Sequence, residues 1–179
     1  WALSTFAMAM ASLTPWLMFS ALAEWLGPRP GRRLLMALGL AMTVGYALSF
    51  HHYALRVGWS NLLLSAQMLL VARAALWPAR PARRNWRWLL AGSYLTVGVF
   101  TLGRGILGGF FAELYPSFMS PHPINVGAQI ASNVLQALAT VAVLVAWRDE
   151  AEADLRTMAT TDGLTRLLNH RTWHERAQH

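Results

Sequence analysis

Long apolar runs, separated by short polar gaps, occupy most of the chain. A helix needs roughly 20 residues to cross a hydrocarbon core about 30 Å thick. Backbone groups in lipid must form their hydrogen bonds within the same segment, so each run is predicted to be a helix. The five predicted spans are Trp1–Leu26, Leu34–Phe50, Val57–Trp77, Trp88–Ala112 and Ile124–Trp147. The second is the shortest and depends most on its flanking residues.

Composition agrees with lipid as the solvent. Of the 179 residues, 55% are hydrophobic and 13% are charged, whereas a soluble domain has about 25% charged residues. The net charge of +7 comes from arginine without any lysine. These arginines lie mostly in gaps between apolar runs and not on one polar domain, which argues against a nucleic-acid partner. Cysteine is absent, so neither disulfides nor cysteine-based metal and redox chemistry are expected.

Arginine is distributed unequally between the two sides of the predicted bundle. The gaps 27–33 and 78–87 hold seven arginines, whereas the gaps 51–56 and 113–123 hold only Arg56. Arginine-rich short loops stay in the cytoplasm. We therefore expect a multi-pass protein of the bacterial inner membrane, with Trp1 outside and the tail after Trp147 inside. Five tryptophans then form an aromatic belt at the cytoplasmic boundary: Trp25, Trp77, Trp86, Trp88 and Trp147. An outside start with an odd number of spans also predicts at least one further span upstream.

The composition changes abruptly after the fifth span. Residues 148–160 are mostly polar and include neither glycine nor proline, so the fifth helix is predicted to continue into the cytoplasm without a break. A short heptad seam follows spacings of four and three residues: Leu144, Arg148, Ala151, Leu155 and Met158. An arginine in so short a seam makes it marginal as a coiled coil, and a solvated juxtamembrane helix explains this segment equally well.

A turn and a second helix are predicted next. Asp162-Gly163 is a turn dipeptide. Leu164, Leu167 and Leu168 then have the spacing of one apolar helix face. The residue types alone support nothing more specific.

This stretch also resembles the entrance of the GGDEF family of diguanylate cyclases. In that family a signalling helix leads into D-x-L-T and, after a short gap, L-x-N-R-R. The matching positions are Asp162, Leu164, Thr165, Leu167, Asn169 and Arg171. The preceding residues 155–161 are similar to the family's L-x-x-[LM]-A-x-x lead-in. Arg166 stands where glycine is usual and His170 replaces the first arginine of N-R-R; we expect the fold to tolerate both changes.

The resemblance implies a domain organisation and a function. Residues 1–147 would form a membrane sensor or anchor domain, residues 148–160 a signalling helix, and residues 161–179 the first part of an α/β GGDEF domain. The whole protein would make cyclic di-GMP from two GTP molecules with Mg²⁺, as a homodimer joined through the signalling helix. The G-G-[DE]-E-F signature and the metal-binding acids lie further downstream in the family, so no catalytic, cofactor-binding or metal-binding residue is assigned in this chain. Asp162 and Arg171 would pair across the junction; a helix cap beside an exposed arginine is the equally weighted alternative.

Arg104 is the clearest candidate for sensing, because an ionisable side chain within a span is costly. It follows Trp88 by 16 residues, about 24 Å at about 1.5 Å per residue, which places it in the outer half of the membrane. There it could meet an anionic ligand or a lipid headgroup. The favoured interpretation is a side chain that reaches outward and pairs with Glu113 or a neighbouring helix.

Two other polar groups are candidates. His51 and His52, with His122 from the other outer gap, could bind a transition metal or respond to pH. Adjacent helical residues point about 100° apart, so polar surface side chains are the simpler explanation. A polar stripe on the fifth span is expected to pack against another helix or a neighbouring protomer; it consists of Gln129, Ser132, Asn133 and Gln136. Small-residue faces suited to close helix contact are expected at Ala37, Ala41 and Gly45, and at Gly105 and Gly109.

The leading prediction is therefore an all-α bundle of about five transmembrane helices that serves a membrane diguanylate cyclase as sensor or anchor. Three alternatives stay open. The spans could be a passive anchor, because the outer gaps are short. The GGDEF domain could be a degenerate regulatory module without catalysis. A transporter or channel would need broken helices, paired repeats and several buried charges, for which only Arg104 is even a partial candidate.

Overall fold

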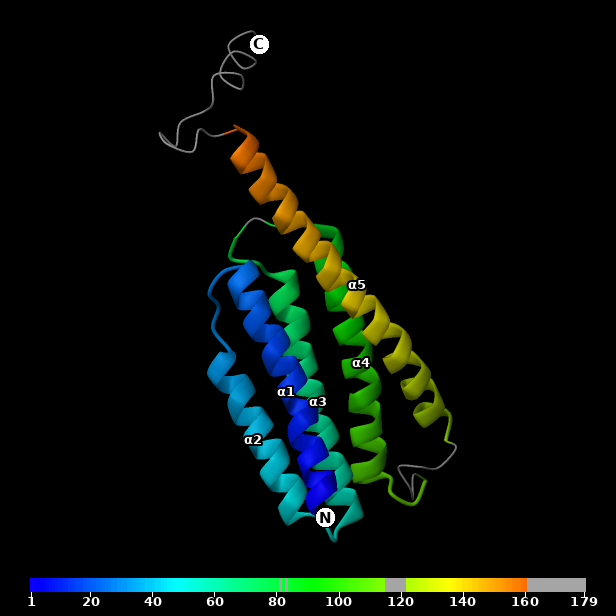
Figure 1. The fold of residues 1–179 in the computed structure, drawn as a ribbon. Helices are drawn as coiled ribbons and strands as arrows, with labels where there is room; N and C mark the ends of the chain where they lie inside the picture. Colours follow the sequence, from blue (N-terminus) through cyan, green and yellow to red (C-terminus); the bar gives the residue numbers. More distant parts are fainter. Residues whose placement is uncertain (81, 83, 115–121, 161–179) are drawn as a thin grey trace.

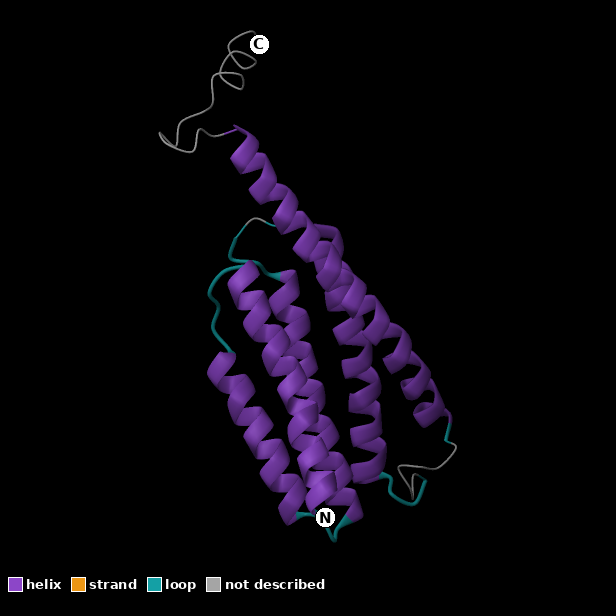
Figure 2. Cartoon of the chain, in the orientation of Figure 1, coloured by secondary structure: helices purple, strands orange, loops and turns teal. Residues whose placement is uncertain are grey.

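Helices are the regular secondary structure of the described part of the chain. In this computed structural model the described residues are 1–80, 82, 84–114 and 122–160, and they include no strand (Figure 2). The helices are α1 (Ala2–Trp25), α2 (Arg32–Leu48), α3 (Tyr53–Leu76), α4 (Arg84–Phe110) and α5 (Pro123–Thr160) (Figure 1). The predicted all-α class is confirmed for these residues. The α/β fragment predicted at 161–179 lies outside them.

Successive helices run in opposite directions (Figure 1). Helix α3 packs against α1, α2 and α4, whereas α5 packs mainly along α4. The connection 26–31 and residues 77–80 lie together at one end, which we call the arginine-rich end. The N-terminus, the α2–α3 turn and the end of α4 lie at the other, which we call the opposite end. Helix α5 continues well beyond the arginine-rich end (Figure 1).

Four of the described helices, α1, α3, α4 and α5, are long and apolar enough to cross a membrane. Helix α2 is not among them, since it has 17 residues, about 26 Å at about 1.5 Å per residue. Its outer face is nevertheless apolar: Met36, Leu40, Val44 and Leu48 recur at every fourth position and are all exposed. Large apolar side chains are exposed on the other helices too. Such a surface is compatible with contact to lipid chains.

The first connection is built from glycine and proline. Gly27 and Gly31 have φ angles of 89° and 123°, a region that residues with a side chain rarely adopt. Pro28 and Pro30 both lie between these two glycines. Neither proline can donate the backbone hydrogen bond that would continue a helix. The chain therefore leaves α1 and enters α2 within a few residues.

Two arginines cap the C-terminal end of α3. The Arg29 guanidinium donates to the carbonyl of Ala74. Arg87 donates from Nε to the carbonyl of Ala75 at 2.8 Å and from Nη2 to that of Leu76 at 2.5 Å. The last carbonyls of a helix have no partner within it, and cations stabilise this end of the helix dipole. Burial, and secondly repulsion from Arg87, lowers the pKa of Arg29.

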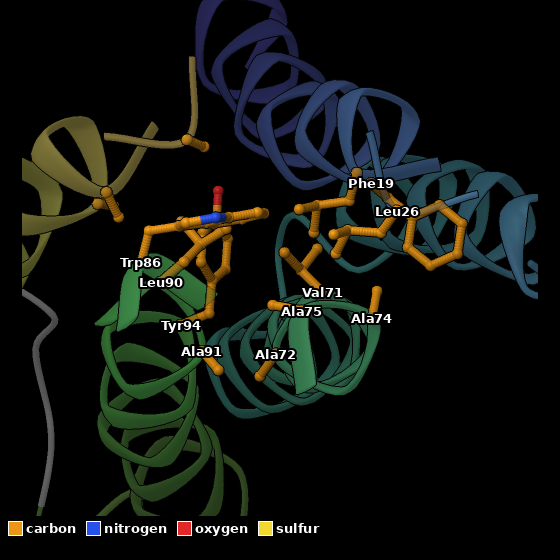
Figure 3. Close-up of a cluster of buried hydrophobic side chains, with 14 of the residues drawn as sticks. Phe19, Leu26, Val71, Ala72, Ala74, Ala75, Trp86, Leu90, Ala91 and Tyr94 are labelled. Atoms are coloured by element: carbon orange, nitrogen blue, oxygen red, sulfur yellow. The ribbon is translucent and has the colours of Figure 1, made fainter. Parts of the chain in front are cut away.

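The apolar core lies in the half of the bundle nearest the arginine-rich end. Leu22 of α1 belongs to it and is fully buried. Leu26, just after α1, lies there with Val71 of α3 and Leu90 of α4, and these three are also fully buried (Figure 3). Trp86 completes this core.

The five predicted belt tryptophans have different surroundings. Trp77 and Trp147 are 69% and 66% exposed, as a lipid boundary requires. Trp86 is only 5% exposed. Its ring meets that of Trp25 edge to face, with centroids 6.2 Å apart. The prediction of a belt position is therefore wrong for Trp86, because this side chain turns inward and joins α4 to α1.

Candidate functional site

Polar side chains are buried in the half of the bundle nearest the opposite end. Ser60 and Asn61 of α3 bond to their own helix, with Ser60 Oγ donating to the carbonyl of Arg56 at 2.7 Å and Asn61 Nδ2 to that of Val57 at 2.9 Å. Ser65 Oγ instead crosses to α4 and donates to the carbonyl of Gly98 at 2.9 Å. These side chains form a polar interior between the helices. Hydropathy predicts the helices themselves but does not indicate that polar side chains are buried between them.

A cavity of about 420 Å³ opens among these polar groups. Every described helix contributes to its wall, through Met8 of α1, Tyr46 of α2, Arg56 of α3, Arg104 of α4, and Ser132 and Gln136 of α5. The volume is within the range of about 300–1,000 Å³ that is usual for small-molecule sites. The cavity is therefore the candidate site of this bundle.

Arg56 is held in place by the residues that end α2. Its Nη1 donates to the carbonyl of Phe50 at 2.8 Å, and its guanidinium carbon lies 5.0 Å from the centre of the Phe50 ring. The same guanidinium carbon lies 5.8 Å from the centre of the Tyr46 ring. The sequence pattern indicated Arg56 only as the single arginine of an outer gap and not as a cavity residue. Its position close to the start of a span was the one sequence feature that could have marked it as part of a site.

Arg104 is partly buried and lines the same cavity from α4. The backbones of α3 and α4 come close together just after it along α4. A Cβ placed on Gly105 would lie 3.1 Å from both Asn61 Cβ and Leu62 N, and one placed on Gly58 would lie 3.0 Å from Gly109 Cα. The predicted close contact at Gly105 and Gly109 is thus confirmed, with Gly58 as a partner that the sequence pattern did not indicate.

The predicted histidine group is not brought together as a metal site. His51 and His52 are exposed in the α2–α3 turn, and the His51 ring packs edge-on against Phe50 at 5.6 Å. His122 lies at the start of α5, where its Nδ1 accepts a hydrogen bond from the backbone of Ile124 at 3.3 Å. Among the described residues, no group of three histidine, cysteine or acidic side chains could hold a metal ion.

Helix α5 has an exposed face along its whole length. Polar side chains occupy the part beside the bundle: Gln129, Asn133, Gln136 and Thr140, all exposed. The heptad seam continues this face beyond it: Leu144, Arg148, Ala151, Leu155 and Met158, also exposed. At about 100° per residue, all nine fall within about 60° of the direction of Ala151. The opposite face packs against the bundle through small residues: Ala128, Ala139, Ala142 and Ala146, all buried.

An unbroken helix precedes the stretch that is predicted to be a signalling junction. Helix α5 has 38 residues and reaches Thr160, as the sequence predicts. Glu152 forms ion pairs with Arg148 at 3.0 Å and with Arg156 at 3.7 Å along its exposed part. The predicted junction residues lie outside the described residues: Asp162, Leu164, Thr165, Asn169 and Arg171.

Comparison with protein families, with curated proteins and with solved structures finds no match for this chain. Its function is therefore inferred from the geometry of the described residues and from the motif in its sequence.

Proposed function

We propose that this chain is the membrane sensor or anchor region of a diguanylate cyclase. The observation that carries the proposal is the continuity of α5, which is one helix from Pro123 to Thr160. It ends two residues before Asp162, where the stretch that resembles the cyclase entrance begins. A continuous helix is stiff enough to carry a change in bundle packing to that junction.

The placement in the bacterial inner membrane is part of this proposal. The arginine-rich end faces the cytoplasm, because short loops rich in arginine are retained there. Helix α5 then leaves the bundle on the cytoplasmic side, where GTP is available. Helix α2, although short, spans with the other four, since its exposed apolar row requires lipid beside it.

A homodimer through α5 would cover two kinds of side chain on the exposed face of this helix that do not suit their surroundings. Inside the membrane this face carries amides such as Gln129 and Asn133, which are costly in lipid. Beyond the membrane it carries Leu155 and Met158, which are 65% and 76% exposed to what would be water. A second copy of α5 packed on the same face covers both kinds of side chain.

The two halves of this interface use different chemistry. An amide both donates and accepts, so symmetry-related copies of Asn133 can bond to each other, at about 1 kcal/mol per bond in membranes. The cytoplasmic part packs as a heptad seam. In the cyclase family two GTP molecules with Mg²⁺ meet across a dimer, so the packing of the two α5 helices would set the distance between the two half-sites.

Two alternatives have distinct consequences. A passive anchor, or a degenerate GGDEF domain that binds without catalysis, would use the same bundle and the same helix. A transporter-like protein would have helices broken near the middle of the membrane. Each described helix is continuous, which favours the signalling proteins over the transporter.

The test is turnover of GTP to cyclic di-GMP by the full-length protein in lipid nanodiscs. We expect turnover, and we expect Asp162→Ala to reduce it by about tenfold, corresponding to about 1.4 kcal/mol, because the junction loses a charge-assisted hydrogen bond. Glu150→Ala is the matched control, since it removes an exposed acid from α5 about 100° from the direction of Ala151, and it should leave turnover unchanged. GTP binding without turnover would identify a degenerate regulatory relative, and the absence of both would refute the family assignment.

A further inference from the structure

We propose that the cavity lined by Arg56 and Arg104 binds a small amphiphilic monoanion, such as a medium-chain carboxylate. This inference goes beyond the proposed function, and it concerns the bundle whether or not a cyclase follows it. The cavity of about 420 Å³ opens toward the opposite end and borders the apolar core at Met68.

Charge determines the sign of the ligand. Two guanidinium groups, one from α3 and one from α4, line the cavity, and no carboxylate does so among the described residues. The two guanidinium groups give this part of the wall a positive charge, which favours an anion over a neutral or cationic ligand. The guanidinium fork is also the side-chain group that best matches the two oxygens of a carboxylate.

The apolar part of the wall determines the body of the ligand. Leu64 and Met68 line the cavity and follow Arg56 on α3 by 8 and 12 residues, about 12 and 18 Å at about 1.5 Å per residue. Val97 lines it from α4, seven residues before Arg104. These three side chains thus lie deeper than the cations, whereas Val57 lies beside Arg56. Cations near the opposite end and aliphatic side chains deeper in the bundle match a carboxylate with an aliphatic tail better than an inorganic ion.

The walls of this cavity are held in position. Arg56 is fixed by its hydrogen bond to Phe50 and by the ring beneath it. Helices α3 and α4 are locked by the contact between Gly58 and Gly109. When a site is already formed before the ligand binds, less conformational entropy is lost on binding and the affinity is higher. Because Ser132 and Gln136 belong to α5, a bound ligand would also connect the other helices to α5.

The experiment measures binding of radiolabelled octanoate to the purified chain in phosphatidylcholine nanodiscs at neutral pH, with empty nanodiscs as the partition control. We expect saturable binding that octanamide, the neutral analogue of the same length, does not displace. Arg104→Gln and Arg56→Gln should each weaken binding at least about tenfold, while Arg104→Lys should retain part of it. Arg73→Gln is the matched control, since Arg73 is an exposed arginine of α3 outside the cavity wall, and it should bind as the unaltered chain does.

A second variant separates loss of the site from loss of the fold. Met68→Trp leaves both arginines in place but fills the apolar part of the cavity, so it should also weaken octanoate binding. Circular dichroism and size-exclusion chromatography verify that each variant is folded.

Three outcomes would overturn the proposal: binding equal to that of empty nanodiscs, equal displacement by octanamide, or unchanged affinity in both folded glutamine variants. Nanodiscs containing phosphatidylglycerol distinguish a lipid source of the anion. If phosphatidylglycerol raises the melting temperature in an Arg104-dependent manner while octanoate never binds, the occupant is a lipid headgroup and the free carboxylate is excluded. None of these measurements involves GTP. A negative result would therefore refute the anion site without bearing on the cyclase assignment, which is tested by GTP turnover.

Discussion

Gly105 and Gly92 lie on the same helix, α4, in different surroundings. A Cβ on Gly105 would lie 3.1 Å from Asn61 Cβ and from Leu62 N, whereas nothing lies within 4 Å of a Cβ on Gly92. The small-residue spacing in the sequence correctly indicated Gly105 and Gly109 as contact residues. It did not indicate Gly58, which meets Gly109, because a lone glycine at the start of a span has no periodic partner on its own helix.

Gly105→Ala is expected to destabilise the bundle by about 1–3 kcal/mol, since the added methyl group wedges α3 away from α4. Gly92→Ala is the matched control and should be neutral, or stabilising by up to about 1 kcal/mol through helix propensity. Unfolding by sodium dodecyl sulfate in mixed micelles, followed by circular dichroism, measures both. Equal effects of the two substitutions would mean that the α3–α4 contact contributes nothing to stability.

At the scale of elements, the helices were predictable and their ends less so. Helices α3 and α4 begin at Tyr53 and Arg84, four residues before the predicted starts at Val57 and Trp88. Hydropathy reports the part of a helix that suits lipid, and polar residues such as Arg84 extend the helix beyond it. The unbroken α5 was predicted correctly because neither glycine nor proline interrupts residues 148–160.

Cysteine cross-linking tests the proposed α5 dimer, and the chain has no native cysteine to interfere. Leu155→Cys lies about 40° from the direction of Ala151 and should form a disulfide-linked dimer under mild oxidation. Ala153→Cys, on the same exposed part of the helix but about 160° from that direction at about 100° per residue, should remain monomeric. Non-reducing gel electrophoresis measures the ratio. Equal cross-linking at both positions would argue against a defined α5 interface.

At the scale of the whole molecule, the two ends of the bundle differ in charge and in packing. The arginine-rich end is closed by the apolar core and by the caps on α3. The half nearest the opposite end contains the cavity. Charge counting predicted which loops share an end, but it treated all their arginines alike, whereas Arg29 and Arg87 hold α3 in place.

Single-cysteine labelling tests the proposed orientation of the bundle. His51→Cys, at the exposed turn of the opposite end, should react with a membrane-impermeant maleimide on intact spheroplasts. Ala79→Cys, exposed at the arginine-rich end, should react only after permeabilisation, because arginine-rich loops are retained in the cytoplasm. The reverse pattern would invert the topology and place the end of α5 outside the cell.

The helical class, the continuity of α5 and the loops that share an end follow from the amino-acid sequence alone. These features depend on the length, hydropathy and charge of consecutive residues, so they are local properties of the chain. The face that each helix turns inward is visible only in the folded bundle. The cap of Arg29 on Ala74 joins residues 45 positions apart, and Arg56 and Arg104 line one cavity from different helices. Side-chain packing between helices sets these rotations, and hydropathy along one chain does not contain that information.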